Sequence, residues 1–477
     1  MNMQSSPIQT ICSRRPDRRT GKPRARYLAG AILAVLAALP GQSQTFSVLA
    51  SFSGVGAQSN PQVVTPAQGR NGTLYGTTVG KSGSSGALFQ VSTEGILRFP
   101  YSFNSTTGGQ PNGGVILATD GNLYGTASSG GSGGMGVLYR ISPNGVYTVL
   151  HDFLGGSDGA NPVYAPIEAS DGSIYGITTG LPNPTATLYK YAPSTSTFTT
   201  IYVFDQTTGE YPTSLIQAGN GNLYGTISGG ICGEIFELTT SGGLVWSYEF
   251  SCAGRAPGGE GPVQILQAND GNFYGATLVG GSSLGYGVIF RVDQQENVSV
   301  IYTFPNSGQY GAGPIGLTQG TDGNLYGAAA SLGKYNGGTL FQLTTAGDIT
   351  LLYSFSSKEG SSPLAPPVQA TNGLLYGTTE SGGRTSGGVV YSLDMELSPF
   401  VTFVLAAGDV GQSAQVLGQN LTGTTSVTFN GVAATSFSVK SDTFMTAIVP
   451  AGATTGPVIV TTPTGTLTSN VSFRITQ

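Results

Sequence analysis

One motif, typified by Thr119–Ser128, occurs seven times in this sequence at intervals of 49 to 52 residues. Each copy has an Asn or Asp four residues before a tyrosine, and a glycine directly after that Asn or Asp. A repeat of this length indicates a solenoid, a propeller or an array of small units. The repeated tyrosines are Tyr75, Tyr124, Tyr175, Tyr224, Tyr274, Tyr326 and Tyr376.

The residues around Tyr274 show what one repeat contains. Segments rich in Gly, Asn and Asp separate four short runs that are rich in β-branched and aromatic residues, 262–268, 273–278, 288–293 and 298–304. Such runs predict β-strands, and no stretch after residue 43 has a capped helical period. Four antiparallel strands per repeat are typical of one propeller blade. The sequence therefore predicts an all-β fold, with a seven-bladed β-propeller over residues 44–395.

The repeated motif is interpreted as a structural device. Asn-Gly and Asp-Gly are the preferred centres of tight hairpin turns in which both residues take positive φ, so we expect this turn between the first two strands of each blade. Side chains alternate along a strand, which sends Tyr124 and Gly125 to opposite faces. We expect each tyrosine to pack into a glycine gap on the next blade.

The seventh repeat lacks a fourth predicted strand, whereas the other six end in an aromatic run such as 298–304. A spare strand, Thr45–Phe52, lies near the start of the chain. We expect this strand to complete the seventh blade and close the ring, because closure leaves no long exposed sheet edge.

The first residues are typical of a secretory signal peptide. Residues 1–26 hold seven of the nineteen Lys and Arg, and a short apolar run, Tyr27–Gly41, follows. This run is short for a transmembrane span, although an uncleaved anchor is the alternative. We expect residues 1–43 to be the signal peptide and the protein to be exported, either secreted or associated with the cell envelope.

The remaining chain is acidic. Without residues 1–43 it has 12 basic and 23 acidic residues and no basic cluster, which argues against nucleic acid and anionic membranes as partners. We expect a monomer without a transmembrane segment, and a glycan or protein at the cell surface as its partner. No apolar tail follows the last predicted strand, so we expect no C-terminal anchor.

Two cysteines, Cys232 and Cys252, follow the signal peptide. The predicted strands on either side of the turn at 239–243 place them opposite each other in a hairpin, within reach of a disulfide. Export favours oxidation of such a pair. We predict a Cys232–Cys252 disulfide, with two buried free thiols as the alternative.

The sequence lacks the residue patterns that several kinds of catalysis require. The only histidine, His151, occupies the position that Tyr302 and Tyr353 hold in other repeats, so we interpret it as a packing residue. No His/Cys cluster has zinc spacing, and the glycine runs lack the lysine of a phosphate-binding loop. The repeated Asp residues alternate with Asn, as a turn tolerates and a catalytic ring does not. We expect no catalytic residue, metal site or cofactor, with calcium on the Asp-Gly turns as the alternative.

Loop residues on the rim opposite the tight turns are the candidate ligand-binding residues. They combine aromatic and charged side chains with glycine, which suits a sugar ring or a protein surface. The candidates are Tyr211, Arg255, Glu260, Tyr286, Tyr310, Lys334, Tyr335 and Arg384.

The pattern changes at Leu397, where tyrosine disappears and short runs alternate apolar residues with Thr and Ser, as in a small β-sandwich. The segments VLGQNLTG, SVTFNGVAATSFSV and SFRIT resemble an immunoglobulin-like IPT/TIG domain, which we expect over residues 396–477. The segments DGNLYGT and GVLYRIS resemble the bacterial GloVer tandem-repeat family of exported, choice-of-anchor proteins. The second resemblance implies export and surface association, and no established activity.

These features predict an exported, non-enzymatic binding or adhesion protein that uses the propeller loop face for a glycan or protein ligand. One alternative is a carbohydrate-active lyase or hydrolase that uses carboxylates and tyrosines on that face. Another is a passive structural protein of the cell envelope. The scarcity of histidine and the lack of metal-ligand clusters favour binding over catalysis.

Overall fold

The computed structural model describes residues 44–81, 83–180, 185–204, 211–229, 232–251 and 258–476. The predicted signal peptide, Cys252 and Arg255 lie outside these residues; Cys232 is described and buried, and the disulfide stays a prediction. The described residues form strands, turns and one short 3-10 turn, η1 (Gly156–Asp158), which confirms the all-β prediction. Among them, no helix has the length and apolar character needed to cross a membrane.

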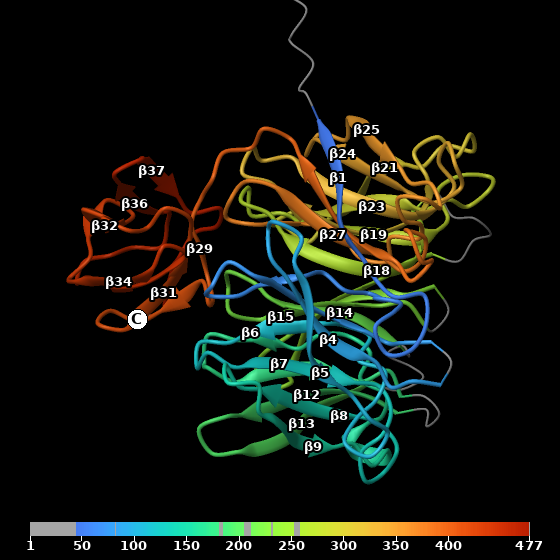
Figure 1. The fold of residues 1–477 in the computed structure, drawn as a ribbon, viewed down its shortest axis with the longest axis horizontal. Coiled ribbons are helices and arrows are strands. Elements are labelled where there is room, and N and C mark those ends of the chain that lie inside the picture. The colour runs from blue at the N-terminus through green and yellow to red at the C-terminus, as the bar shows by residue number, and fades with distance from the viewer. Residues whose placement is uncertain are drawn as a thin grey trace, which may run out of the picture. The chain divides into compact units, whose positions relative to one another are not determined.

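The described part of residues 45–394 forms seven four-stranded antiparallel sheets (Figure 1). We number them 1 to 7 in chain order, and the strand named first for each sheet below is called its first strand. Sheet 1 contains β2 (Ala67–Gln68), β3 (Leu74–Thr78), β4 (Ala87–Val91) and β5 (Leu97–Ser102). Sheet 2 contains β6 (Val115–Leu117), β7 (Leu123–Ala127), β8 (Val137–Ile141) and β9 (Tyr147–Asp152). Sheet 3 contains β10 (Ile167–Glu168), β11 (Ile174–Ile177), β12 (Ala186–Ala192) and β13 (Thr197–Phe204).

The later sheets follow the same order. Sheet 4 contains β14 (Pro212–Gln217), β15 (Leu223–Ile227), β16 (Glu234–Leu238) and β17 (Leu244–Glu249). Sheet 5 contains β18 (Glu260–Gln267), β19 (Phe273–Val279), β20 (Val288–Val292) and β21 (Val298–Thr303). Sheet 6 contains β22 (Ala312–Gln319), β23 (Leu325–Ser331), β24 (Thr339–Leu343) and β25 (Ile349–Ser354). Sheet 7 contains β26 (Val368–Gln369), β27 (Leu375–Thr379), β28 (Val389–Asp394) and, from the start of the chain, β1 (Thr45–Ser51).

Strand β1 joins the two ends of the repeat region. It pairs antiparallel with β28, from Thr45 opposite Asp394 to Ser51 opposite Val389. This pairing confirms the prediction that the spare strand completes the last sheet. At one end of β1, Phe46 stacks on Tyr353 of sheet 6 at 3.7 Å between ring centroids. Just beyond its other end, Phe52 packs edge-on against Phe89 of sheet 1 at 5.0 Å, so this segment contacts both neighbouring sheets.

The hairpin turn of the repeated motif differs from the predicted type. In the second repeat Gly121 has a φ of 85°, but no Asn or Asp of the seven motifs has a positive φ. The Gly121 N–H donates to the Ala118 carbonyl at 2.9 Å, and the Ala118 N–H donates to the Asn122 carbonyl at 3.0 Å. This pattern is a type I turn followed by a left-handed glycine. The Asp120 carboxylate accepts the Asn122 N–H at 2.9 Å, so the side chain holds the turn.

The repeated tyrosine is tied to the same turn residue. The Tyr124 hydroxyl donates to the Asp120 carboxylate at 2.7 Å, and Tyr175, Tyr274 and Tyr326 do the same with their own Asp at 2.7 to 2.9 Å. Where the turn residue is Asn, its amide donates to the tyrosine oxygen instead, as from Asn372 to Tyr376 at 2.7 Å. Because a tyrosine hydroxyl both donates and accepts, Asp and Asn are interchangeable here.

The glycine after each tyrosine makes room within its own sheet, which corrects the predicted gap on the next blade. A Cβ at Gly125 would lie 2.4 Å from the hydroxyl of Tyr139, its cross-strand partner in β8. Tyr124, on the other face, shares a core cluster with Ile174 and Tyr189 of sheet 3, so the prediction that it faces the next sheet is confirmed. The aromatic residues opposite the seven glycines are Phe89, Tyr139, Tyr189, Phe236, Phe290, Phe341 and Tyr391.

A belt of side chains links successive sheets near these turns. Gln217, which ends the first strand of sheet 4, accepts the Ser170 N–H of sheet 3 at 2.8 Å. Gln68 of sheet 1 accepts the Thr371 N–H of sheet 7 at 2.9 Å, so the series of sheets closes on itself. Sequence reasoning missed this belt, although the same position holds Gln68, Leu117, Glu168, Gln217, Gln267, Gln319 and Gln369.

Residues 400–476, which we call the C-terminal segment, form two further four-stranded sheets and a short parallel pair. One sheet contains β29 (Thr402–Phe403), β31 (Ser413–Leu417), β35 (Phe444–Ile448) and β34 (Phe437–Ser441). The other contains β33 (Val432–Ala433), β32 (Ser426–Phe429), β36 (Val458–Thr462) and β37 (Gly465–Thr468). The parallel pair is β30 (Ala407–Gly408) with β38 (Arg474–Ile475). A single apolar cluster, which includes Val416, Phe429 and Phe473, forms the core of this segment.

The C-terminal segment contacts the turn side of the repeat sheets. The Arg70 guanidinium donates to the Gln415 side chain at 2.6 Å, and the Thr443 hydroxyl donates to the Arg70 carbonyl at 2.8 Å. The Gln419 amide donates to the Thr371 hydroxyl at 3.0 Å. The polar contacts that hold the segment thus include the turns of sheets 1 and 7.

Closure by the β1 segment can be tested at Phe52, which is fully buried. Phe52→Ala should lower the free energy of unfolding by about 3–5 kcal/mol, because a large buried side chain is removed. Val55→Ala, three residues on at a site that is 70% exposed, should change it by about 0.5 kcal/mol or less. Urea denaturation of both variants measures this, and equal stabilities would contradict the closure.

Glu168 is the one acid in the belt, and it provides a pH test. Burial raises the pKa of its carboxyl above the usual 4.5, although hydrogen bonds from Thr119 oppose this. A raised folded-state pKa gives stability that is present below pH 4.5 and lost as the pH rises through the folded pKa. Glu168→Gln should therefore raise the melting temperature at pH 7 by about 1–3 °C, and the gain should shrink toward pH 4.5.

Gln369→Glu makes the reverse change at the equivalent position of sheet 7, where Gln369 bonds the N–H and the hydroxyl of Thr321. It should lower the melting temperature at pH 7 and lose this effect in acid. Thermal unfolding of both variants at the two pH values measures the difference. A Glu168→Gln protein that melts below the parent at pH 7 would contradict the cost that we assign to burying the Glu168 charge.

Candidate functional site

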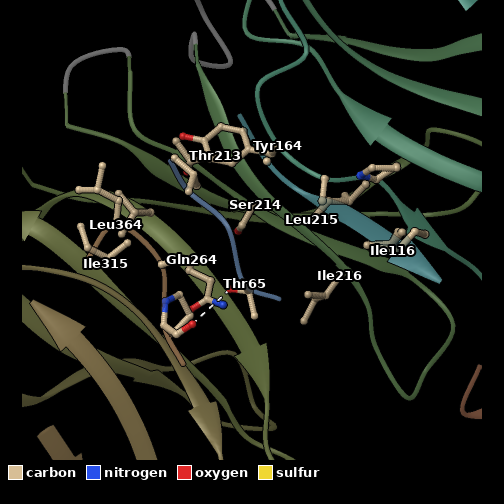
Figure 2. Close-up of a pocket in the computed structure, with 18 of the residues that line it drawn as sticks. Thr65, Ile116, Tyr164, Thr213, Ser214, Leu215, Ile216, Gln264, Ile315 and Leu364 are labelled. Carbon is tan, nitrogen blue, oxygen red and sulfur yellow. Dashed lines mark hydrogen bonds between the residues drawn. The ribbon is translucent and has the colours of Figure 1, made fainter. Parts of the chain in front are cut away.

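A cavity of about 520 Å³ lies where the first strands of the sheets meet, and we call it the central channel (Figure 2). Every sheet contributes to its wall at or just before the first strand. One lining residue from each of the sheets 1 to 7 is Thr65, Val115, Ile167, Leu215, Val263, Ile315 and Leu364. The channel therefore exists only because the series of sheets closes.

A proline precedes the channel wall in every sheet, and the residue before it is in the left-handed region. The φ values of these residues are 54° to 67°, at Asn60, Gln110, Asn161, Tyr211, Gly261, Gly313 and Ser362. Such a conformation is strained for a residue other than glycine, particularly before proline. Packing holds it in place: a Cβ at Gly136 would lie 2.7 Å from the ring of Pro162 in the next sheet.

Most of the channel wall is apolar. The described residues that line it include neither charged residues nor histidine or cysteine, and their polar side chains are those of Thr65, Tyr164, Thr213, Ser214 and Gln264. Several of these are already bonded to protein. The Thr213 hydroxyl donates to the Pro262 carbonyl at 2.9 Å, and the Ser214 hydroxyl lies 2.7 Å from that of Thr226.

Tyr164 has the most available polar group in the channel. Within the described residues, its hydroxyl has no hydrogen-bond partner, while the Gln264 side-chain oxygen accepts the Leu317 N–H at 2.5 Å. Burial raises the pKa of Tyr164 to about 12, so its hydroxyl is a proton donor near neutral pH. Figure 2 shows Tyr164 and Thr213 toward one end of the cavity, with Gln264 and Thr65 farther along it.

The predicted loop residues do not line the channel. Tyr211 precedes Pro212, and its carbonyl accepts the Ser228 N–H at 3.1 Å. Glu260 begins β18, opposite Val279. Neither the Tyr211 side chain nor the Glu260 side chain is among those that line the cavity.

The other predicted loop residues are scattered. Tyr286 and Tyr310 pack against the core formed by sheets 5 and 6. The Lys334 ammonium lies 5.0 Å from the ring centroid of Tyr335, whose side chain is 54% exposed. Arg384 lines a separate cavity beside β1. The structure thus places these residues apart, and their predicted role in ligand binding stays a prediction.

His151 is a packing residue, as its position suggested. It lies opposite Leu138, as Tyr302 lies opposite Ile289 and Tyr353 opposite Leu340, which confirms the equivalence. Its ring stacks on Phe198 at 3.5 Å between centroids, and its Nε2 lies 3.1 Å from Asp158. Burial lowers the pKa of His151 despite this carboxylate. In the described part of the chain, no three His, Cys, Asp or Glu side chains form a group that could hold a metal ion.

Sequence reasoning missed the channel residues, although one signal pointed to them. A proline recurs 12 to 14 residues before each repeated tyrosine, at Pro61, Pro111, Pro162, Pro212, Pro262, Pro314 and Pro363. Channel-lining side chains begin within a few residues of it, as Tyr164 does after Pro162. A repeated proline thus marks the first strand of each sheet more directly than the loop aromatics do.

Comparison with sequence families supports the repeat analysis. The profile of the Gloeobacter/Verrucomicrobia repeat matches residues 34–234 and 228–444. No curated protein matches the chain.

Solved structures with similar folds include lyases and a lactonase. A catalytically inactive histidine-to-alanine variant of virginiamycin B lyase from Staphylococcus aureus, solved with quinupristin, has a TM-score of 0.52 and 14% identity, covering 74% of this chain and 99% of that one. An oligogalacturonate lyase in complex with manganese has a TM-score of 0.48 and 12% identity, covering 74% and 97%. The periplasmic gluconolactonase of Pseudomonas aeruginosa has a TM-score of 0.43 and 15% identity, covering 68% and 97%.

These similarities correct the leading functional prediction. The repeat sheets have a propeller-like arrangement, and the similar structure with a TM-score of 0.52 is that of a lyase. The prediction of a non-enzymatic binding or adhesion protein is therefore wrong. That prediction relied on the scarcity of histidine and the lack of metal-ligand clusters, and it placed the binding residues on the loop face rather than in the channel.

Proposed function

The chain belongs to the Gloeobacter/Verrucomicrobia repeat family, and from that premise we propose that its seven sheets are the blades of a seven-bladed β-propeller. The closed series of hydrogen bonds between sheets supports this blade count. We propose further that the C-terminal segment is an immunoglobulin-like IPT/TIG sandwich, supported by its two sheets around one core. Export with a cleaved signal peptide, a Cys232–Cys252 disulfide and a monomeric state complete this proposal.

We propose that the protein is a carbohydrate-active enzyme of the lyase or hydrolase class, with its reaction site in the central channel. The observation that carries this is Tyr164, which lines an apolar cavity and whose hydroxyl has no hydrogen bond to the described residues. Polar groups that point into a concave apolar site are typical of substrate-binding sites. The lyase among the similar structures supports the reaction class by analogy of fold.

The wall of the channel favours an uncharged substrate. A charged group would lose its hydration there, and no lining side chain of opposite sign would compensate. The apolar surfaces of Leu215 and Ile265 suit the C–H face of a sugar or lactone ring. Two carboxylates, the usual pair for glycoside hydrolysis, do not line this cavity, so the proposed chemistry relies on a single proton donor.

In this proposal Tyr164 acts as the proton donor. As a C–O bond of the substrate breaks, the hydroxyl proton passes to the departing oxygen. In a hydrolase a water molecule forms the new bond to carbon and returns a proton to the tyrosine oxygen. In a lyase the returned proton comes from the carbon next to the breaking bond. Because its pKa is raised, the Tyr164 hydroxyl is protonated near neutral pH, so the proton is present before the C–O bond breaks.

Tyr164→Phe tests this role, since it removes the hydroxyl and keeps the ring. The full chain and the variant are incubated with neutral oligosaccharides and sugar lactones, and the products are followed by mass spectrometry. We expect the variant to lose about 10²–10⁴-fold in kcat, the usual contribution of a general acid.

Tyr335→Phe is the matched control, because Tyr335 lies on the loop face, outside the channel. It should keep full activity, and both variants should melt at the parent temperature. Turnover by Tyr164→Phe at the parent rate would exclude Tyr164 as the donor. Failure of the parent to convert any substrate in the panel would count against the carbohydrate assignment.

A further inference from the structure

A second cavity, of about 610 Å³, lies between the turn side of the repeat sheets and the C-terminal segment. Residues such as Gln217 and Gln267 line it from sheets 4 and 5, and Leu405 and Arg474 line it from the C-terminal segment. Ile167 and Ile216 line both this cavity and the central channel, so the two are neighbours along the wall of the first strands. We call it the turn-side cavity.

Strand pairing holds the backbone of Arg474, which lines this cavity. It begins β38, which pairs in parallel with β30, and its N–H donates to the Ala406 carbonyl at 2.9 Å. Its guanidinium donates to the Gln217 side-chain oxygen at 3.3 Å. That oxygen also accepts the Ser170 N–H at 2.8 Å, so it is held by the belt. The strand pair and the belt thus position the guanidinium before any ligand binds.

The charge of Arg474 is uncompensated by the described residues. The ion pairs found among them are His151 with Asp158 and Lys190 with Asp171, and neither involves Arg474. Desolvation lowers the pKa of Arg474, and no carboxylate contributes in the opposite direction. The acid that also lines the cavity, Glu168, accepts the N–H and the hydroxyl of Thr119 instead.

We infer that the turn-side cavity binds a small organic monocarboxylate, with Arg474 as the group that pairs with it. A planar guanidinium matches a carboxylate in shape and charge. One cation compensates one negative charge, which favours a monoanion over a phosphate or sulfate dianion. The apolar walls at Ile167, Leu266 and Leu405 suit the body of such a molecule.

This inference is independent of the proposed catalysis, because Arg474 does not line the central channel. Isothermal titration calorimetry of the full chain tests it with four probes: glucuronate and benzoate, and their uncharged partners glucose and benzyl alcohol. We expect at least one carboxylate to bind and its uncharged partner to bind at least tenfold more weakly. The affinity should also fall as salt is added.

Arg474→Gln should weaken carboxylate binding at least tenfold, and Arg474→Lys, which keeps the charge but loses the planar fork, should weaken it less. Arg98→Gln is the control, since Arg98 is exposed on β5, remote in sequence from the cavity lining. Tyr164→Phe should bind the carboxylate as the parent does. Thermal unfolding without ligand shows whether the Arg474 variants keep their fold.

Two results would overturn the inference. One is the absence of heat and of any rise in melting temperature with both carboxylates. The other is equal affinity of the parent and a folded Arg474→Gln protein. If the parent converts no substrate, the binding result still stands, so the two proposals can fail independently.

Discussion

The pairing of β1 with β28 is the contact on which the rest of the structure depends. A series of seven sheets encloses a channel only if the last sheet meets the first, and β1 supplies the outer strand of the last sheet. Its flanking aromatics, Phe46 and Phe52, reach the sheets on either side. On the turn side, the hydrogen bond from Thr371 to Gln68 closes the belt at the same junction. Without these contacts the first strands would not face one another across a shared cavity.

Much of the fold could be predicted from the sequence because its signals are local. The period, the four strands of a repeat and the spare strand follow from runs of β-branched and aromatic residues between Gly, Asn and Asp. The partners of the repeated residues are not local. Gly125 is needed because Tyr139 lies across the sheet, and Asp120 is needed because the Tyr124 hydroxyl returns to it. Both facts depend on register, which a single strand does not specify.

The candidate site was harder to predict, for a physical reason. Aromatic residues on glycine-rich loops resemble ligand contacts, yet Tyr286 and Tyr310 fill space beside a core. The channel residues have no common identity, because each sheet contributes a different side chain at the same place. Apart from Thr65, which donates to the Pro366 carbonyl, the polar ones lie on sheets 3, 4 and 5. The turn-side cavity is lined from the same three sheets. Both cavities therefore depend on sheets 3, 4 and 5, although the repeated motif is the same in all seven sheets.

If the channel holds the reacting substrate, as we propose, a large side chain that fills the channel should block turnover. Ala165 lines the cavity beside Tyr164, and Ala165→Trp would occupy much of the space there. Ala451→Trp, at an exposed site in the C-terminal segment, controls for the added side chain. With the full chain and a converted substrate, we expect Ala165→Trp to lose turnover, while the turnover of Ala451→Trp and the melting temperatures stay unchanged. Full turnover by a folded Ala165→Trp protein would contradict it.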